Sequence, residues 1–286
     1  MNPRVERFMR FWRLYRRSKL AVAGLFILAA IVISALLAPL FTPYDPFQLV
    51  GKHIVPPQPG FPMGTDDMER DVFTGVLYGA RTSLFVAATA MLISQSLGAM
   101  MGAVSGYSGG LVDDVLMRIT DFFQIIPRFF LALIIAAFIG PSTWNIIFAI
   151  TVVSWPSPAR LIRSETLTLK TQTYVEAAKA LGSGSFRIIF REVLPNALHI
   201  LIVNASLTMG HAILLESGLG FLGLADPSVM SWGYMLYRAM ATLRIAWWPL
   251  FFTGLMVFLT VFCANVIGDG LNDALNPRIA FRRARR

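Results

Sequence analysis

Long uncharged segments alternate with polar stretches along this chain. Three uncharged runs, 20–41, 82–112 and 245–268, each exceed the roughly 20 residues that a helix needs to cross a bilayer. The first run is too long for the apolar region of a signal peptide and lacks a convincing small-x-small cleavage site, so it predicts an uncleaved anchor. The pattern indicates membrane-spanning helices.

Two further apolar segments complete the pattern. Residues 129–159 are uncharged but too long for one crossing, and Gly140-Pro141 interrupts them, so they predict a helical hairpin. Residues 197–215 supply one more span. Together the segments predict an all-α membrane protein with six transmembrane helices, at about 20–41, 83–105, 119–139, 143–159, 197–216 and 248–268.

Composition agrees with this prediction. Hydrophobic residues make up 56% of the 286 residues and charged residues 14%, whereas a soluble domain carries about 25% charged residues. The single cysteine, Cys263, lies inside the last predicted span, which excludes an intrachain disulfide and a cysteine-based metal or redox site.

The net charge of +9 is concentrated on one side of the predicted membrane. Most of the 25 Lys and Arg residues precede the first span, lie in the loop 160–196 or follow the last span. By the positive-inside rule this side is the cytoplasm, so both termini are expected there. The distribution argues against nucleic acid as a partner. The N-terminal basic segment most simply retains the topology, and contact with anionic membrane lipid is the alternative.

The expected organisation follows from these segments. Residues 42–80 are rich in Pro and Gly and too polar to cross the membrane, so they are expected outside the cell. The predicted parts are a basic cytoplasmic tail (1–19), a first transmembrane helix (20–41), an external segment (42–80), a core transmembrane domain (81–271) that contains the cytoplasmic loop 160–196, and a basic cytoplasmic tail (272–286).

The cytoplasmic loop contains the segment Tyr174-Val-Glu-Ala-Ala-Lys-Ala-Leu-Gly182, followed by Leu194-Pro195. It predicts a short helix that ends at Gly182 as the C′ residue, while Pro195 is tolerated in the first turn of the next helix. Glu176 can support the short helix through Lys179 or the next turn. Small side chains gather on one surface of this helix, which suits docking against another protein; they are Ala177, Ala178 and Ala180.

Small residues also recur every four positions in the second span, at Ser94, Gly98, Gly102 and Gly106. This spacing lets helices approach closely where no hydrophobic effect drives their association. Ordinary packing within the chain is the simpler explanation, and a contact with another subunit or a moving surface is the alternative.

Several polar side chains lie near or within predicted spans. Arg118 can pair with Asp114 at i,i+4, and Arg128 either snorkels or pairs with Asp121.

The fifth span carries four polar residues, His199, Asn204, His211 and Glu216. The two histidines are about three helical turns apart, too far to share one ion, so helix-packing hydrogen bonds explain them better. Glu216 is the best candidate for a role at the outer face or on a translocation path.

Catalytic motifs are absent from the sequence. The chain has no G-x-x-x-x-G-K-[ST], H-E-x-x-H or G-x-S-x-G pattern with the required context, so it cannot supply a P-loop ATPase and offers no catalytic, cofactor or metal residues.

Glu176-Ala177-Ala178, with Gly182 and Leu194-Pro195 at their spacing, resembles the cytoplasmic EAA loop of ABC importer permeases. Glu192 stands where many members carry Ile, a mild departure. Further motifs along residues 20–280 are similar to those of the C-type permease of the dipeptide, oligopeptide and nickel importer group. They are Gly64-Thr65-Asp66 with Arg70-Asp71, Gly79-Ala80-Arg81-Thr82-Ser83-Leu84, Gly106-Tyr107, Glu216-Ser217, Ser231-Trp232-Gly233 and Gly268-Asp269-Gly270-Leu271.

This resemblance implies the type I (MetI-like) importer permease fold, in a multi-pass protein of a bacterial or archaeal cytoplasmic membrane. It implies a second, homologous permease as heterodimer partner, two ABC ATPase subunits that bind ATP and magnesium, and an extracytoplasmic solute-binding protein. The loop residues Tyr174, Glu176, Ala177, Ala178, Ala180, Gly182, Leu194 and Pro195 would dock the ATPase. Candidates for the outer gate or for contact with the binding protein are Asp66, Arg70, Asp71, Arg81, Glu216 and Trp232.

The resemblance implies di- or oligopeptides as the solute and leaves alternatives open. Glu69 replaces a Gly of the external motif, and Asn272 and Asn276 stand where Arg and Asp are common, so the match to any one member is not close. Nickel or another metal chelate, glutathione and opine or sugar solutes are the alternatives.

Two other classes of function are less consistent with the sequence. An ion-coupled secondary transporter would need acidic residues at the membrane midplane, whereas Glu216 and Asp269 lie near span ends. A membrane-embedded enzyme or a scaffold would not explain the spacing of the EAA loop.

Overall fold

The computed structural model describes residues 3–275, and these form helices joined by loops, with no strand in that range. The helices are α1 (Pro3–Tyr15), α2 (Lys19–Leu36), α3 (Ala38–Phe41), α4 (Val72–Ser108), α5 (Gly110–Ile125), α6 (Arg128–Ile139), α7 (Thr143–Ser154), α8 (Pro156–Leu169), α9 (Thr173–Ala180), α10 (Ser185–Ile188), α11 (Leu194–Leu219), α12 (Trp232–Thr242) and α13 (Trp248–Leu275), with π-helical turns η1 (Ile189–Val193) and η2 (Gly220–Leu224).

Within residues 3–275, five helical segments are long and apolar enough to cross a membrane, and a bent pair makes a sixth if it counts as one span. The predicted all-α fold with six spans is confirmed on that count. The five segments are Lys19–Leu36, Val72–Ser108, Thr143–Leu169, Ser185–Leu224 and Trp248–Leu275, and the pair is Gly110–Ile125 with Arg128–Ile139.

Several helix ends differ from the predicted spans. The second span begins at Val72 rather than at 83, because the Asp71 side chain accepts the Thr74 N–H at 2.9 Å and caps the helix there. The third span is bent by 85° between α5 and α6. Pro127, at this break, has no N–H to continue the helix. The fourth span continues from α7 through α8 as far as Leu169.

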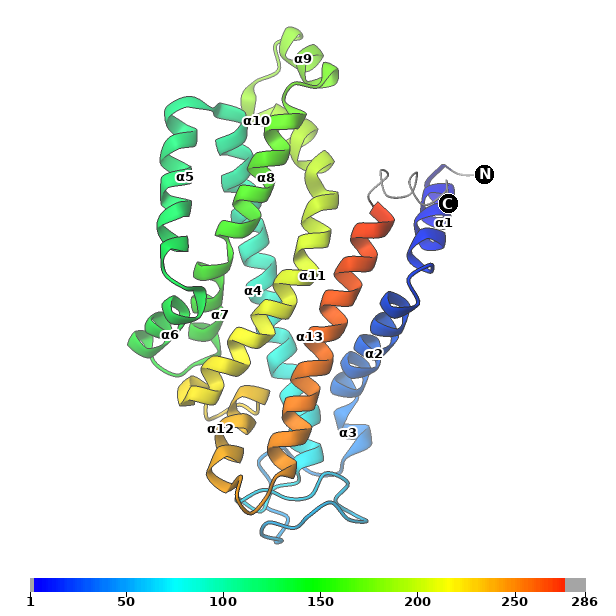
Figure 1. The fold of residues 1–286 in the computed structure, drawn as a ribbon, viewed down its shortest axis with the longest axis vertical. Helices are drawn as coiled ribbons and strands as arrows, with labels where there is room; N and C mark the ends of the chain where they lie inside the picture. Colours follow the sequence, from blue (N-terminus) through cyan, green and yellow to red (C-terminus); the bar gives the residue numbers. More distant parts are fainter. Residues whose placement is uncertain (1–2, 276–286) are drawn as a thin grey trace.

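The long helices lie side by side, and α4 packs against α2, α7, α8 and α11 (Figure 1). At one end of the bundle lie α9, α1 and the last turns of α13. At the other end lie α12 and the loop 42–71 (Figure 1). The segments predicted to be cytoplasmic therefore share one end, and the loop 42–71, predicted to be external, lies at the opposite end with α12. The basic tail from residue 276 onward lies outside the described residues.

The small residues of α4 pack against α8 of the same chain. A Cβ on Gly98 would lie 2.6 Å from Pro158 Cγ, and a Cβ on Gly106 would lie 2.8 Å from the Arg163 carbonyl oxygen. Packing within the chain, the simpler of the two predicted explanations, accounts for the stripe.

Candidate functional site

The short helix predicted in the cytoplasmic loop is α9, and it ends as the sequence indicates. Gly182 adopts φ +78°, the left-handed conformation that glycine enters without steric cost. The N–H of Ser183 donates to the Ala178 carbonyl at 3.0 Å and that of Gly182 to the Lys179 carbonyl at 2.9 Å. These two bonds form a Schellman motif, which gives the end of α9 a defined geometry.

One face of α9 is seated on the rest of the protein. Val175 is fully buried and packs with Ile188 and Val193, and half-buried Ala178 and Tyr107 pack on this cluster. Ala178 therefore does not share the outward surface on which it was predicted. Of the predicted docking residues in 174–182, those that do lie exposed are Tyr174, Glu176, Ala177, Ala180 and Gly182.

Two exposed apolar side chains extend this outward surface. Leu181 is 86% exposed at the end of α9. Phe186 is 75% exposed in α10 and contacts Phe190, with ring centroids 4.4 Å apart and ring planes tilted by 40°. Sequence reasoning missed both, although a Leu and a Phe on either side of the Gly-Ser-Gly-Ser segment 182–185 were a signal. Together Tyr174, Ala177, Leu181 and Phe186 form an exposed surface, which we name the α9 surface.

Pro195 lies in the first turn of α11, as predicted, but α11 continues without a break from the turns before it. The helix begins at Ser185 and runs through a π-helical turn at 189–193, in which the Leu194 N–H donates to the Ile189 carbonyl. Pro195 lacks an N–H and its ring clashes with the carbonyl four residues earlier, and the wider π turn accommodates both. Leu194 is half-buried against the cluster that contains Ile162, so of this pair only Pro195 is exposed.

Ion pairs join the helices behind α9. Arg163 of α8 donates two hydrogen bonds to Asp113 of α5, each 2.6 Å long, and Ser105 of α4 donates to the same carboxylate. The predicted Arg118–Asp114 pair is not formed, and both side chains are exposed. Another pair joins Arg160 to Asp121 at 2.5 Å, so Asp121 does not pair with Arg128.

α9 also contacts α4 directly. Lys179 places its Nζ 5.2 Å from the centre of the Tyr107 ring, and Lys170, just before α9, donates to the Gly106 carbonyl at 2.8 Å. Both partners lie at the end of α4. The Lys179–Tyr107 contact therefore joins α9 to α4, and the Lys170–Gly106 bond joins the end of α8 to α4.

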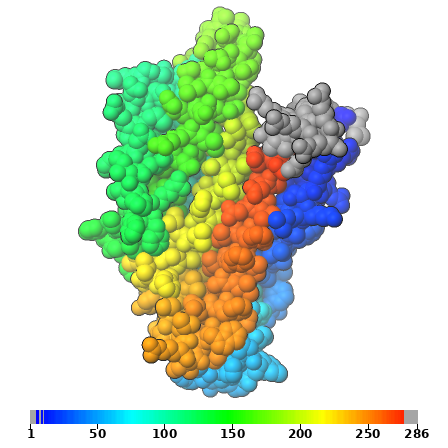
Figure 2. Space-filling model, viewed as in Figure 1, coloured from blue at the N-terminus to red at the C-terminus, as the bar shows by residue number. Residues whose placement is uncertain are grey.

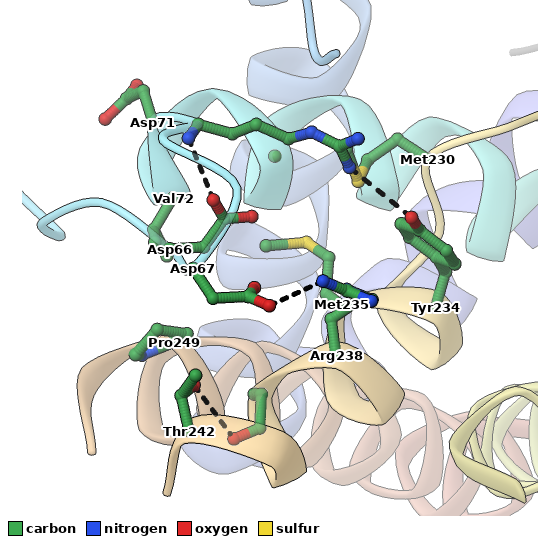
Figure 3. Close-up of a pocket in the computed structure, with 13 residues that line it drawn as sticks. Asp66, Asp67, Asp71, Val72, Met230, Tyr234, Met235, Arg238, Thr242 and Pro249 are labelled. Carbon is green, nitrogen blue, oxygen red and sulfur yellow. Dashed lines mark hydrogen bonds and ion pairs between the residues drawn. The ribbon is translucent and has the colours of Figure 1, made fainter. Parts of the chain in front are cut away.

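At the opposite end, the external loop is tied to α12. Arg238 of α12 forms an ion pair with Asp67, and Arg70 donates to the Tyr234 hydroxyl at 3.4 Å (Figure 3). Asp66 accepts the N–H groups of Met68 and Arg70 at 2.8 Å each, and burial raises the pKa of its carboxyl. Of the predicted outer residues, Asp66 and Arg70 are thus half-buried at the loop–α12 junction.

Asp71 and Arg81 have local structural partners. Asp71 is 6% exposed and caps α4. Arg81 donates from Nε to the Ala35 carbonyl at 2.5 Å and from Nη2 to the Leu36 carbonyl at 2.6 Å, so it satisfies the last carbonyls of α2.

Glu216 and Trp232 are buried together at the junction of α4, α11 and α12. The Glu216 carboxylate is surrounded by the hydroxyls of Ser83, Ser217 and Ser231 and by the Gly233 N–H. Trp232 donates its N–H to Ser83 Oγ and its indole N–H to the Val76 carbonyl, each at 3.1 Å. Neither side chain reaches the surface, since Glu216 is 1% exposed and Trp232 0%.

The polar residues of α11 fall into different environments. Asn204 accepts from Gln95 of α4 at 2.7 Å, which is the helix-packing bond expected for it. His199 is exposed, and its Nδ1 lies 2.9 Å from the Asn196 carbonyl oxygen. Within residues 3–275 no three His, Cys, Asp or Glu side chains are grouped closely enough to hold a metal ion.

The fold defines an all-helical, multi-pass membrane protein. The family model for the binding-protein-dependent transport system inner membrane component matches residues 97–281, and the model for the N-terminal transmembrane domain of oligopeptide transport permease C matches residues 7–57. The chain belongs to this family of importer permeases, whose members work with ATPase and solute-binding partners in the cytoplasmic membrane.

Curated relatives match nearly the whole chain. The dipeptide transport system permease protein DppC of Bacillus subtilis is 40% identical over 94% of this chain and 85% of its own. The oligopeptide transport system permease protein OppC of the same organism is 36% identical over 93% and 88%. The glutathione transport system permease protein GsiD of Pectobacterium atrosepticum is 37% identical over 94% and 90%.

A solved structure shares the fold at low identity. The MetNI methionine ABC transporter, solved in inward-facing conformations, matches with a TM-score of 0.58 and 19% identity, over 71% of this chain and 96% of its own. The predicted MetI-like fold is confirmed.

Proposed function

We propose that this chain forms half of the translocation pathway of an ATP-driven importer of di- and oligopeptides, next to a homologous permease with which it forms a heterodimer. Relatives named for dipeptide, oligopeptide and glutathione transport support the substrate class, since glutathione is itself a peptide. The chain is non-catalytic in this proposal, and ATP and magnesium bind to the partner ATPase subunits.

The main support for this proposal is that the α9 surface is exposed. It exposes Leu181 and Phe186 to 86% and 75%, while buried Val175 fixes the helix from behind. Large apolar side chains held on a rigid seat suit insertion into a groove of another protein. ATP-driven closure of the ATPase pair would move α9 and, through Tyr107 and Gly106, the end of α4.

The outer end has a separate role in this proposal. The binding protein would dock on the loop 42–71 near Asp66 and Arg70, which are half-buried in that loop. Asp71, Arg81, Glu216 and Trp232 would instead hold the helices of the outer gate, because their contacts are internal to the chain.

Co-purification of the ATPase subunits with a tagged permease tests the docking role. Leu181→Glu and Phe186→Glu should reduce the recovered ATPase at least about tenfold, because a charge at the centre of an apolar contact is costly to desolvate. Leu49→Glu, at a 62% exposed position of the external loop, is the control that should leave recovery unchanged. Undiminished recovery with both α9 variants would show that the ATPase docks elsewhere.

A further inference from the structure

Burial changes sharply along α11. In the half from Thr208 to Leu219, which points toward the loop 42–71, most side chains are buried. In the half from Leu194 to Leu207, which points toward α9, only Ala197 is buried. The bundle around α11 is therefore closed at the outer end and open at the end that carries α9.

A groove of about 400 Å³ lies along the open half of α11. It is formed between α8, α11 and α13, and α11 crosses one face of the molecule between the other two helices (Figure 2). This volume falls within the range of small-molecule sites, roughly 300–1,000 Å³. Its lining includes Leu161, His199, Val203, Asn204, Leu207 and Asn272.

Aliphatic side chains, Ile200 and Leu275 among them, make up most of the lining, and its polar members are His199, Asn204 and Asn272, with no carboxylate, lysine or arginine. His199 uses Nδ1 toward the Asn196 carbonyl, which leaves Nε2 for the groove. The Asn204 oxygen is occupied by Gln95 and Thr208, and within residues 3–275 its amide nitrogen donates to no other group. Asn272 is exposed, and its side chain likewise has no hydrogen-bond partner in the described part of the chain.

Hydrocarbon would leave the three polar side chains of this groove without partners. Amide and imidazole groups without partners cost several kcal/mol each in an apolar medium, whereas water or a polar solute satisfies them. The same helix also presents Leu198 and Ile202, each 50% exposed and neither in the groove, which is the composition expected of a lipid-facing surface. The face of α11 in the groove is therefore suited to contact water, and the face with Leu198 and Ile202 is suited to contact lipid.

We propose that this groove is the cytoplasm-facing half of the solute pathway, filled with water and occupied in passing by the peptide. Its amide groups bind the peptide main chain, and the absence of carboxylates and permanent cations among its lining residues lets acidic and basic peptides pass alike. This inference rests on the proposed import of peptides and adds the residues that would line the route.

Cysteine accessibility tests whether water fills the groove. In a Cys263→Ala background, Val203→Cys lies in the groove and Ile202→Cys lies beside it on the same helix. The complete transporter, with both permeases, both ATPases and the binding protein, is treated from the ATPase side with a membrane-impermeant quaternary-ammonium methanethiosulfonate. Because the reagent attacks thiolate in water, Val203→Cys should react at least about tenfold faster than Ile202→Cys.

Equal rates at the two positions would overturn the proposal. ATP-driven uptake of Ala-Ala by the wild-type transporter separates the hypothesis that the groove is part of the pathway from the hypothesis that the protein imports peptides. An unreactive Val203→Cys with normal uptake refutes the groove and leaves the proposed function standing. A reactive Val203→Cys without any peptide uptake refutes the proposed function and, with it, the peptide as occupant.

A pair of charged variants tests the second half of the proposal. Asn272→Asp should lower the ratio of Ala-Glu uptake to Ala-Lys uptake several-fold, and Asn272→Lys should raise it several-fold, because each introduces a charge that repels one of the peptides. Asn272 is exposed, so both variants are expected to fold. A defect that lowers the uptake of both peptides equally in both variants would overturn the assignment of Asn272 to the pathway.

Discussion

Gly98 of α4 lies so close to Pro158 of α8 that a Cβ at this glycine would stand 2.6 Å from the proline Cγ and 2.7 Å from the Trp155 carbonyl oxygen. Gly102 makes a similar approach to the backbone of Ala159 one turn further along. The two helices meet backbone to backbone, and this contact links the fourth predicted span to the longest helix of the bundle.

Gly98→Val should therefore destabilise the protein strongly. Overpacking costs about 1–3 kcal/mol where side chains can shift, and here the obstacle is largely backbone and a proline ring. Thermal unfolding of the purified protein in detergent measures the loss. Gly254→Val in α13 is the matched control, since nothing lies within 4 Å of its Cβ position. If both variants melt alike, the close approach of α4 and α8 is not what makes Gly98 necessary.

The four-residue spacing of Ser94, Gly98, Gly102 and Gly106 was visible in the sequence, but the helix it packs against was not. Hydropathy located the spans because each is a long local run. It missed the 85° bend between α5 and α6, since hydropathy locates apolar residues but carries no information on the angle between two helices at Pro127. It also missed the Val72 start of α4, because Arg81 interrupts the uncharged run although its guanidinium is satisfied by the carbonyls of α2.

Side-chain partners were the least predictable part of the candidate site. Asp113 pairs with Arg163 of α8, whereas the predicted pair of Asp114 and Arg118 within α5 is not formed. α8 is distant from α5 in the sequence but lies beside it in space. Local rules at i,i+4 cannot anticipate such a pair. The end of α9 at Gly182 was predictable, since a Schellman motif depends only on neighbouring residues.

The Arg163–Asp113 pair should contribute measurably to stability. Arg163→Lys keeps the charge but loses the two parallel hydrogen bonds, and we expect a loss of about 1–3 kcal/mol. A double-mutant cycle with Asp113→Asn measures the coupling. Arg160→Lys, whose pair with Asp121 is roughly half exposed, is the control and should cost less than about 1 kcal/mol. A coupling energy near zero for Arg163 and Asp113 would contradict this expectation.

The Glu216 carboxylate should be needed as an acceptor for the hydroxyls and the N–H around it. Glu216→Ala leaves these donors without a partner, at a cost of about 1–3 kcal/mol for each one left unsatisfied, whereas Glu216→Gln retains one acceptor oxygen. We expect the alanine variant to lose both thermal stability and transport and the glutamine variant to lose less of each. Equal losses in the two variants would mean that the negative charge, not the acceptor geometry, is required.

The ion pair between Arg238 and Asp67 should hold α12 against the external loop. Arg238→Ala and Asp67→Ala each break it, and since both side chains are mostly buried each leaves its partner poorly compensated. We expect binding-protein-stimulated ATP hydrolysis by the assembled transporter to fall several-fold in either variant. The exchanged pair Arg238→Asp with Asp67→Arg should recover part of the lost activity. Undiminished ATP hydrolysis in both single variants would show that this ion pair plays no part in the response to the binding protein.

Gly182→Val should uncouple transport while leaving insertion and folding intact. The glycine holds φ +78°, which costs a valine about 1–2 kcal/mol, so the valine variant should change how α9 ends and tilt the α9 surface away from its partner. Nothing lies within 4 Å of the new Cβ, so the effect cannot come from a clash. Gly184→Val is the matched control, because that position is equally open and has no positive φ. The measurement is ATP-driven uptake together with recovery of the ATPase on the tagged permease. Normal uptake by Gly182→Val would show that the geometry of this helix end does not matter for coupling.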